Sequence, residues 1–214
     1  MGTVLVTGFE AFGGEPENPS ALIAQALDGR VIAGRTVRGV VLPVVFGASL
    51  ARLKDAITEH APELVLAVGQ AGGRNSVQLE RVAINVDDAR FADNAGQQPI
   101  DVPVVEGGPV GFWSTLPIKA IVGAIRQAGI PADVSQSAGT FVCNHVFYGL
   151  LHALEGTDVR CGFVHVPFLP EQAARHPVRP PSCPLDAQIR AIEIAIITAL
   201  TTRADAREAG GATH

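Results

Sequence analysis

Short apolar runs that alternate with helix-like segments constrain the fold of this chain more than any other feature. Residues 4–6, 64–68 and 162–166 are almost entirely apolar, and each run ends within a few residues at a glycine or proline. Runs that are apolar on both faces indicate strands buried inside a parallel sheet. The sequence therefore predicts an α/β protein, with a twisted, mostly parallel sheet covered by helices on both faces.

The spacing of apolar residues predicts the remaining elements. Asn18 can cap a helix that begins at Pro19 and runs to residue 27. The segment of residues 88–116 is too long for a simple connection between two elements, and long loops of this kind are often functional. We expect strands over residues 31–42 and 77–86, and helices over residues 49–60, 117–128, 141–154 and 185–202.

The length of the chain fits one domain. Its 214 residues are 47% apolar, which is enough for a large core, and they contain no internal repeat or linker. We expect a single domain over residues 1–204, followed by a short, frayed C-terminal tail over residues 205–214.

Charge and cysteine content limit the partners and the compartment. The formal net charge is −5 and the basic residues are scattered, so we expect neither nucleic acid nor an anionic membrane as a partner. Three cysteines are too few for a secreted disulfide scaffold. The sequence shows no signal-peptide pattern and no apolar run of the ~18 residues that a spanning helix needs. These features favour the cytoplasm.

Cys143 is the first candidate catalytic residue. Small and polar residues precede it and a helical pattern follows, so we expect it in the first turn of a helix. There the free N–H groups and the helix dipole favour the thiolate and can hold an oxyanion. The alternative is a buried structural cysteine, which is the commoner fate of this residue type.

His165 and Glu80 are candidates for the base and its partner. His165 lies near the end of an apolar strand, where an α/β fold presents catalytic groups, and a cysteine nucleophile needs a base. His145 is two residues beyond Cys143 and faces another side of the helix. Glu80 lies in an otherwise apolar stretch, so it either forms an ion pair with Arg81 or another base, or orients His165. Because neighbouring strand residues point to opposite faces, Glu80 and Arg81 belong to different sites.

Two glycine-rich loops follow predicted strands, at residues 8–14 and 69–74. The first lacks the Lys-Ser/Thr pair of a phosphate loop and the second lacks the dinucleotide spacing, so nucleotide binding stays open as a weak alternative. Phe9 and Phe12 lie on the first loop. They indicate either a lining for a flat apolar ligand or plugs over the end of the sheet.

Neither a metal site nor a serine nucleophile fits the sequence. The spacing of Cys143, His145, Cys161 and His165 matches no zinc pattern. Ser137 lacks the glycine two positions earlier that a nucleophile elbow needs. We therefore expect no metal and no cofactor.

Several separated motifs resemble the pyroglutamyl peptidase I family (pyrrolidone carboxyl peptidases), which are intracellular cysteine peptidases. The resemblance covers most of the chain, and its most specific parts are residues 137–144 and 165–172. The other matching segments are residues 8–14, 18–20, 42–46, 69–74, 80–85, 88–90 and 93–94.

The resemblance implies a cofactor-free peptidase that hydrolyses the bond after an N-terminal pyroglutamyl residue of a peptide and releases pyroglutamate. It assigns Cys143 as the nucleophile, His165 as the base and Glu80 as the third member of the triad. It also implies an α/β/α sandwich and a homotetramer.

The resemblance further assigns residues that bind the substrate. Phe12 and Phe141 match the aromatic pair that sandwiches the lactam ring, and Phe9 matches another part of the apolar lining. Gln70 matches a position whose backbone carbonyl accepts the lactam N–H. Asn18 matches a polar contact at the same ring.

Arg90 resembles an arginine placed near the oxyanion. Two dipeptides depart from the usual pattern of the family: Glu-Ala at residues 10–11 replaces Asp-Pro, and Phe-Ala at residues 91–92 replaces Ile-Pro. Loss of a proline loosens the unfolded chain and does not require a different folded path.

Two other functions stay open on the sequence alone. One is a nucleoside phosphorylase-like enzyme on a similar scaffold. The other is a small-molecule binding module that keeps the slot without turnover. The presence of Cys143, His165 and Glu80 together argues against the binding module.

Overall fold

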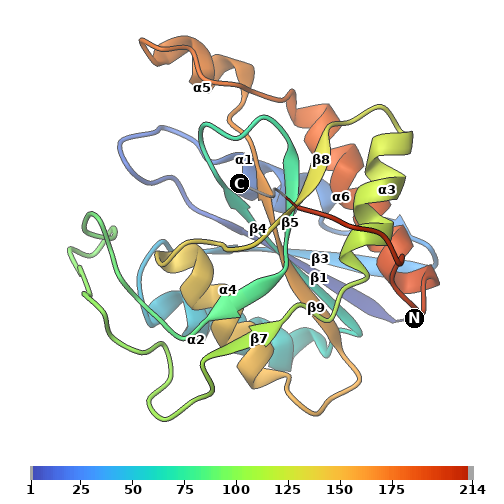
Figure 1. Cartoon of the computed structure of the whole chain (residues 1–214), viewed down its shortest axis with the longest axis horizontal. Helices are drawn as coiled ribbons and strands as arrows, with labels where there is room; N and C mark the ends of the chain where they lie inside the picture. Colours follow the sequence, from blue (N-terminus) through green and yellow to red (C-terminus); the bar gives the residue numbers. More distant parts are fainter. Residues whose placement is uncertain (1, 212–214) are drawn as a thin grey trace.

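A seven-stranded sheet runs through the centre of the computed structural model, which describes residues 2–211 (Figure 1). Its strands are β1 (Thr3–Phe9), β2 (Val31–Ile32), β3 (Arg35–Leu42), β4 (Leu64–Gln70), β5 (Val77–Glu80), β8 (Ala132–Ser135) and β9 (Arg160–Val166). They lie in the order β2-β3-β1-β4-β9-β5-β8. The β2–β3 and β5–β9 pairs are antiparallel and the other four are parallel, which confirms the predicted α/β class.

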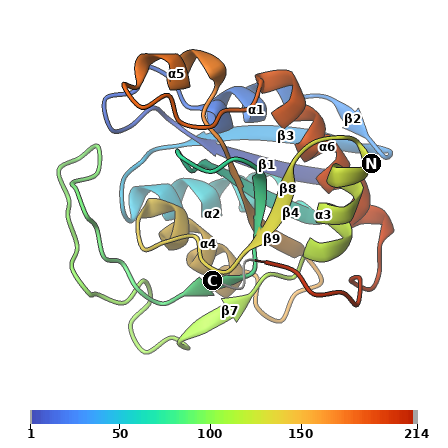
Figure 2. The ribbon, with the colours of Figure 1, turned by 45° about the horizontal axis from the view of Figure 1, so that its top comes forward.

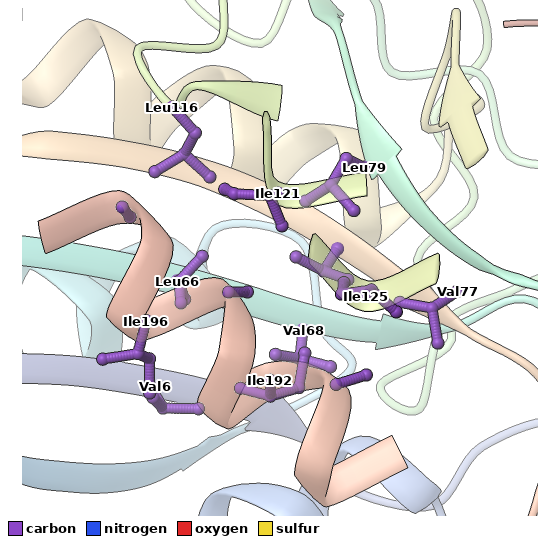
Figure 3. Packing of buried hydrophobic residues seen from close by; sticks show 14 of the residues in the cluster. Val6, Leu66, Val68, Val77, Leu79, Leu116, Ile121, Ile125, Ile192 and Ile196 are labelled. Carbon is purple, nitrogen blue, oxygen red and sulfur yellow. The ribbon is translucent and has the colours of Figure 1, made fainter. Parts of the chain in front are cut away.

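Helices cover both faces of this sheet (Figures 1 and 2). Because side chains alternate along each strand, Val6 and Leu66 point to one face and pack with Ile192 (Figure 3). Leu5 points to the opposite face and packs with Phe147. The first face carries α1 (Pro19–Leu27), α3 (Ile118–Gln127) and α6 (Leu185–Thr201), and the second carries α2 (Ala48–His60) and α4 (Val142–Ala153).

The predicted strand over residues 77–86 is in fact two strands in different sheets. β5 ends at Glu80, and β6 (Val82–Ile84) pairs antiparallel with β7 (Gly111–Trp113) in a separate two-stranded sheet. The change of partner occurs at Arg81, whose N–H donates to Ser135 O and whose carbonyl accepts from the N–H of Ser114. Both halves carry apolar residues, so their pattern gives no sign of the break.

Three short elements were not predicted from the sequence: β7, which lies in the segment expected to be a long loop, β8 and α5 (Pro170–Arg175). β8 contains Asp133 and Ser135, which interrupt its apolar pattern. The helix α5 has six residues and lies beside the loop that precedes α1 (Figure 2). Its Arg175 forms ion pairs with Glu15 and Glu17 of that loop.

The segment that follows α6 contacts the domain through Asp205 and Gly210. The Asp205 carboxylate accepts hydrogen bonds from the backbone N–H groups of Lys119 and Ala120 at 3.0 and 2.9 Å. Arg81 donates to the carbonyl of Gly210 at 2.7 Å. The acidic residue thereby caps the start of α3. Residues 212–214 lie outside the described residues.

No helix among residues 2–211 is long and apolar enough to cross a membrane.

Two glycines allow α1 to lie directly on the sheet. A Cβ on Gly8 in β1 would overlap the backbone oxygen of Ser20, and a Cβ on Gly39 in β3 would overlap that of Ala24. Both glycines face the same helix, so the helix backbone rests on the strand backbone. This contact holds α1 against the end of β1, next to the loop that carries Phe12.

We expect the substitution Gly39→Ala to destabilise the fold by about 2 kcal/mol, because the added methyl group forces backbone atoms apart in a packed interior. Gly123 in α3 is the matched control, since a Cβ there meets nothing within 4 Å. Gly123→Ala is expected to stabilise the protein by about 1 kcal/mol through helix propensity. Urea denaturation of both variants checks this, and equal effects of the two would contradict the argument.

Candidate active site

One pocket brings Cys143 and His165 together at the carboxyl ends of β4 and β9. Its volume is about 290 Å³, and both side chains line it. Cys143 is the second residue of α4, as predicted, and His165 is the penultimate residue of β9. Gly69 of β4 pairs in register with His165, and a Cβ on Gly69 would lie 3.0 Å from Cys143 Sγ. The sulfur therefore lies over Gly69, directly beside the histidine strand.

Glu80 lies behind His165, on the neighbouring strand. His165 Nδ1 is 2.7 Å from Glu80 Oε1, and both side chains are buried. The antiparallel pairing of β5 and β9 sets Gln78 opposite His165 and so fixes this contact. A proton on Nδ1 donates to the carboxylate, which leaves Nε2 free to accept a proton from a thiol. This is the acid–base relay expected of a catalytic triad.

Arg74 was missed by the sequence reasoning. It donates to Glu80 Oε1 at 2.9 Å and lines the same pocket as Cys143. Burial raises the pKa of Glu80. However, the hydrogen bond and charge of His165, a hydrogen bond from Ser135 and the charge of Arg74 outweigh burial and hold this pKa below its usual 4.5. The sequence shows Gly-Gly-Arg at residues 72–74 but gives no sign that the Arg74 side chain contacts Glu80.

The Cys143 thiol is neutral in the free site, in contrast to the predicted thiolate. Burial, and to a lesser extent the charge of Glu80, raise its pKa to about 12, while the charge of Arg74 opposes the rise. Desolvation of this half-buried thiol outweighs the favourable helix terminus. A neutral thiol needs a base before it can act as a nucleophile, and His165 shares its pocket.

An aromatic slot adjoins the cysteine. The rings of Phe12 and Phe141 have centroids 6.4 Å apart and planes 36° from parallel. A small cavity of about 10 Å³ lies at this position, and Phe9, Asn18 and Gln70 also line it. The slot is almost closed, so a flat ring enters it only if Phe12 and Phe141 separate slightly.

The two polar residues of the slot are held by other parts of the chain. The Asn18 side chain accepts from the backbone N–H of Ser20 and donates to the carbonyl of Glu10, both at 3.0 Å. Its oxygen thus caps α1, as predicted, and since only one of the two amide N–H groups donates to Glu10, the other is left for a ligand in the slot. The Gln70 side chain accepts from Gln172 Nε2 at 2.9 Å, which fixes the end of β4.

Arg90 is exposed and lines the rim of the pocket that holds Cys143. The preceding segment is anchored to the loop before α4, because Thr140 Oγ1 donates to the carbonyl of Asp88 at 2.7 Å. The structure thus gathers Arg90, Phe12, Phe141 and Gln70 around the cysteine.

His145 belongs to a second buried pair on another face of α4, as the helical spacing predicts. Its Nδ1 lies 2.7 Å from Asp87 Oδ2, and its Nε2 accepts from the N–H of Gly47 at 3.0 Å. Both ring nitrogens are occupied, so His145 holds the start of α2 in place and is not the base for Cys143. Within residues 2–211 no group of three or more metal-ligating side chains is close enough to hold an ion.

Gly69→Ala is expected to lower kcat/KM by at least about 100-fold, since displacement of a reacting atom by about 1 Å has effects of this size. The new Cβ would lie 2.7 Å from the ring of Phe163 and 3.0 Å from the sulfur of Cys143. Gly123→Ala again provides the control, with full activity expected. Steady-state kinetics on folded variants measure the effect, and an active Gly69→Ala enzyme would show that the sulfur does not react from this position.

Known proteins share this fold and sequence. A family model described as pyroglutamyl peptidase matches residues 2–202. The chain is 60% identical to a pyrrolidone-carboxylate peptidase of Escherichia fergusonii and 55% identical to one of Cupriavidus necator, over the full length of each pair.

Solved structures agree. Pyroglutamyl peptidase I from Bacillus amyloliquefaciens superposes with a TM-score of 0.94 at 44% identity, covering 97% of this chain and 99% of that one. Pyrrolidone carboxyl peptidase from Thermococcus litoralis superposes with a TM-score of 0.94 at 40% identity, and the match covers 98% of this chain and 100% of that one. Both the sequence and the fold thus match over nearly their whole length, and the chain belongs to the pyroglutamyl peptidase family.

Proposed function

We propose that Cys143, His165 and Glu80 carry out the reaction of the family in this chain. As a member, the chain is a cysteine-type hydrolase that removes an N-terminal pyroglutamyl residue from peptides. The observation that carries the assignment is the 2.7 Å contact between His165 Nδ1 and Glu80 Oε1, in a histidine that shares a pocket with Cys143. A buried carboxylate behind a histidine that faces a thiol is the arrangement that nucleophilic catalysis requires.

The reaction begins with the neutral thiol. His165 Nε2 takes the Cys143 proton as the sulfur attacks the carbonyl carbon that follows the lactam ring, and Glu80 stabilises the imidazolium. The tetrahedral intermediate collapses when the imidazolium protonates the leaving amine, which breaks the C–N bond. A thioester remains on Cys143. Water, deprotonated by His165, then hydrolyses the thioester and releases pyroglutamate.

The start of α4 stabilises the developing oxyanion. Phe141 occupies the N-cap position, where its side chain cannot accept a hydrogen bond, so no side chain caps the first turn. The N–H of Cys143 lies in that turn, and Arg90 adds positive charge at the rim of the pocket. One correctly placed donor to an oxyanion typically contributes ~3 kcal/mol to transition-state stabilisation.

Recognition of pyroglutamate follows from its chemistry. The residue is a flat, neutral lactam without a free amine, so a site built for an ammonium group would not hold it. We propose that Phe12 and Phe141 sandwich the ring, while Phe9 completes the apolar lining. The Gln70 backbone carbonyl accepts the lactam N–H. Asn18 makes a polar contact at the same ring, and its cap on α1 holds the Phe12 loop.

We also propose the cellular setting and the assembly. The chain works in the cytoplasm without cofactor, with residues 1–204 as its single catalytic domain and without nucleic acid or membrane partners. Its three cysteines are all free. The family resemblance supports a homotetramer. Light scattering on the purified protein tests the assembly, because a tetramer has about four times the 22.3 kDa mass of the chain.

A fluorogenic assay tests the function. The reduced protein is expected to release aminocoumarin rapidly from its pyroglutamyl amide and not from the matching proline amide, which lacks the lactam carbonyl. Release from both amides would contradict the proposed slot. Phosphate-dependent cleavage of a nucleoside, with no release from either amide, would instead support the phosphorylase alternative.

A further inference from the structure

A second groove adjoins the active-site pocket and has no part in the steps above. Its volume is about 500 Å³, and it shares Phe12, Gln70 and Phe91 with the pocket that holds Cys143 and His165. The two hollows are therefore direct neighbours. A peptide whose first carbonyl lies at Cys143 extends by ~3.3 Å per residue, so its next two residues can reach the groove.

Phe91 forms one wall of this groove. Its side chain is 48% exposed. Its ring packs on Phe141 at a centroid distance of 4.8 Å. The loop that carries Phe91 is anchored two residues later by Asp93. The Asp93 carboxylate accepts hydrogen bonds from the backbone N–H groups of Phe46 and Gln97 at 2.9 and 2.8 Å. Phe91 is thus presented by a fixed loop, facing both hollows.

Phe168 forms another part of the groove wall. A Cβ on Gly72 would overlap the Phe168 ring, so the ring occupies its position only because residue 72 is a glycine. The ring also packs on His176 at a centroid distance of 4.9 Å. Phe168 lines the groove and neither the pocket nor the slot that contact Cys143.

The one charged group in the groove is already paired. Glu15 Oε1 lies 2.8 Å from His176 Nε2, and Glu15 Oε2 accepts from Arg175 at 3.2 Å. Burial raises the pKa of Glu15, but hydrogen bonds from Arg175, Gln172 and His176 lower it overall. The carboxylate is therefore charged, and its charge is neutralised by the pairing with Arg175 and His176. The groove therefore offers a ligand its aromatic walls rather than an unpaired charge.

We propose that this groove binds a bulky apolar or aromatic side chain of the leaving peptide, carried by the first or second residue after the scissile bond. The proposal rests on the proposed function, because the scissile bond has to lie at Cys143. It makes Phe91 and Phe168 specificity-determining residues. An aromatic side chain between two phenyl rings gains both apolar burial and ring packing.

Three short peptide amides test the groove: pyroglutamyl-Ala-Ala, pyroglutamyl-Phe-Ala and pyroglutamyl-Ala-Phe. We expect at least one phenylalanine peptide to show a kcat/KM about tenfold above that of the alanine peptide, as a fully buried aromatic side chain allows. Phe168→Ala should bring this ratio to within about twofold of one, and Phe168→Leu should leave an intermediate ratio. Trp113→Ala is the control, since Trp113 is exposed on β7 and lines neither hollow, and the ratio should persist.

The outcomes separate the two proposals. Equal kcat/KM for all three peptides in the wild-type enzyme would overturn the groove while leaving the peptidase intact. A preference that survives both Phe168 substitutions would also overturn it. Failure to cleave any of the three peptides would overturn the proposed function itself.

Discussion

Cys143→Ala is expected to reduce kcat/KM for pyroglutamyl substrates by about 10⁴-fold or more, because no other thiol lines the pocket to form the thioester intermediate. The pocket also contains His165, Arg74 and Arg90, and none of these side chains forms a thioester. Removal of the sulfur leaves the hydrogen bond between His165 and Glu80 untouched, so the loss reflects chemistry rather than folding.

The control for this variant is Cys183→Ala. Cys183 is also a free, partly buried cysteine, but it lines a different cavity, with Ile130 and Pro184. We expect this variant to keep full activity. Burst kinetics and mass spectrometry should reveal an acyl adduct on the wild-type enzyme and on Cys183→Ala, and none on Cys143→Ala. Turnover by Cys143→Ala above about one-tenth of the wild-type value would exclude Cys143 as the nucleophile.

Glu80→Gln is expected to lower kcat by roughly 10³- to 10⁴-fold with little change in KM. The amide is the same size as the carboxylate but cannot stabilise the imidazolium of His165, and Arg74 loses its charged partner. Glu63→Gln is the matched control, because Glu63 pairs with Arg35 on the surface and both side chains are about 40% exposed. Exposed pairs of this kind contribute about 0–1 kcal/mol to stability, and the control should retain its activity.

The same substitution predicts a dependence of stability on pH. The pKa of Glu80 lies below its usual 4.5 in the folded chain, so its charged form stabilises the fold above that pH. This contribution is lost as the pH falls through the lower, folded pKa. The difference in unfolding free energy between wild type and Glu80→Gln should therefore be constant near neutrality and shrink below pH 4.5. Denaturation curves at several pH values measure it, and a difference that grows on acidification would contradict the pairing.

The sequence predicted the elements whose residues are apolar throughout or at regular spacing. β1, β4 and β9 are continuous apolar runs, and α4 begins where small and polar residues give way to a helical pattern. These elements place Cys143 and His165 at the carboxyl ends of the strands, so the pair could be predicted without a structure. Glu80 was identified because a carboxylate in an apolar strand needs a partner.

Features that depend on contacts between distant segments could not be predicted in this way. The change of partner at Arg81 depends on Ser114 and Ser135, which lie in different parts of the chain. The role of Gly69 depends on the sulfur above it, and the bond from Arg74 depends on where its loop folds. The thiol pKa was predicted in the wrong direction because helix position can be deduced from sequence, whereas the desolvation around Cys143 cannot.

The N-cap position of α4 has a consequence for how this enzyme can evolve or be engineered. Phe141 stands where serine, aspartate or asparagine would stabilise the helix by about 1 kcal/mol. A screen for thermostability alone would favour such a replacement, and it would remove one ring of the proposed lactam slot while filling the proposed place of the oxyanion. At this turn the protein gives up stability for turnover. A bound transition-state analogue supplies the missing cap, so it should raise the melting temperature by more than its apolar contacts alone would.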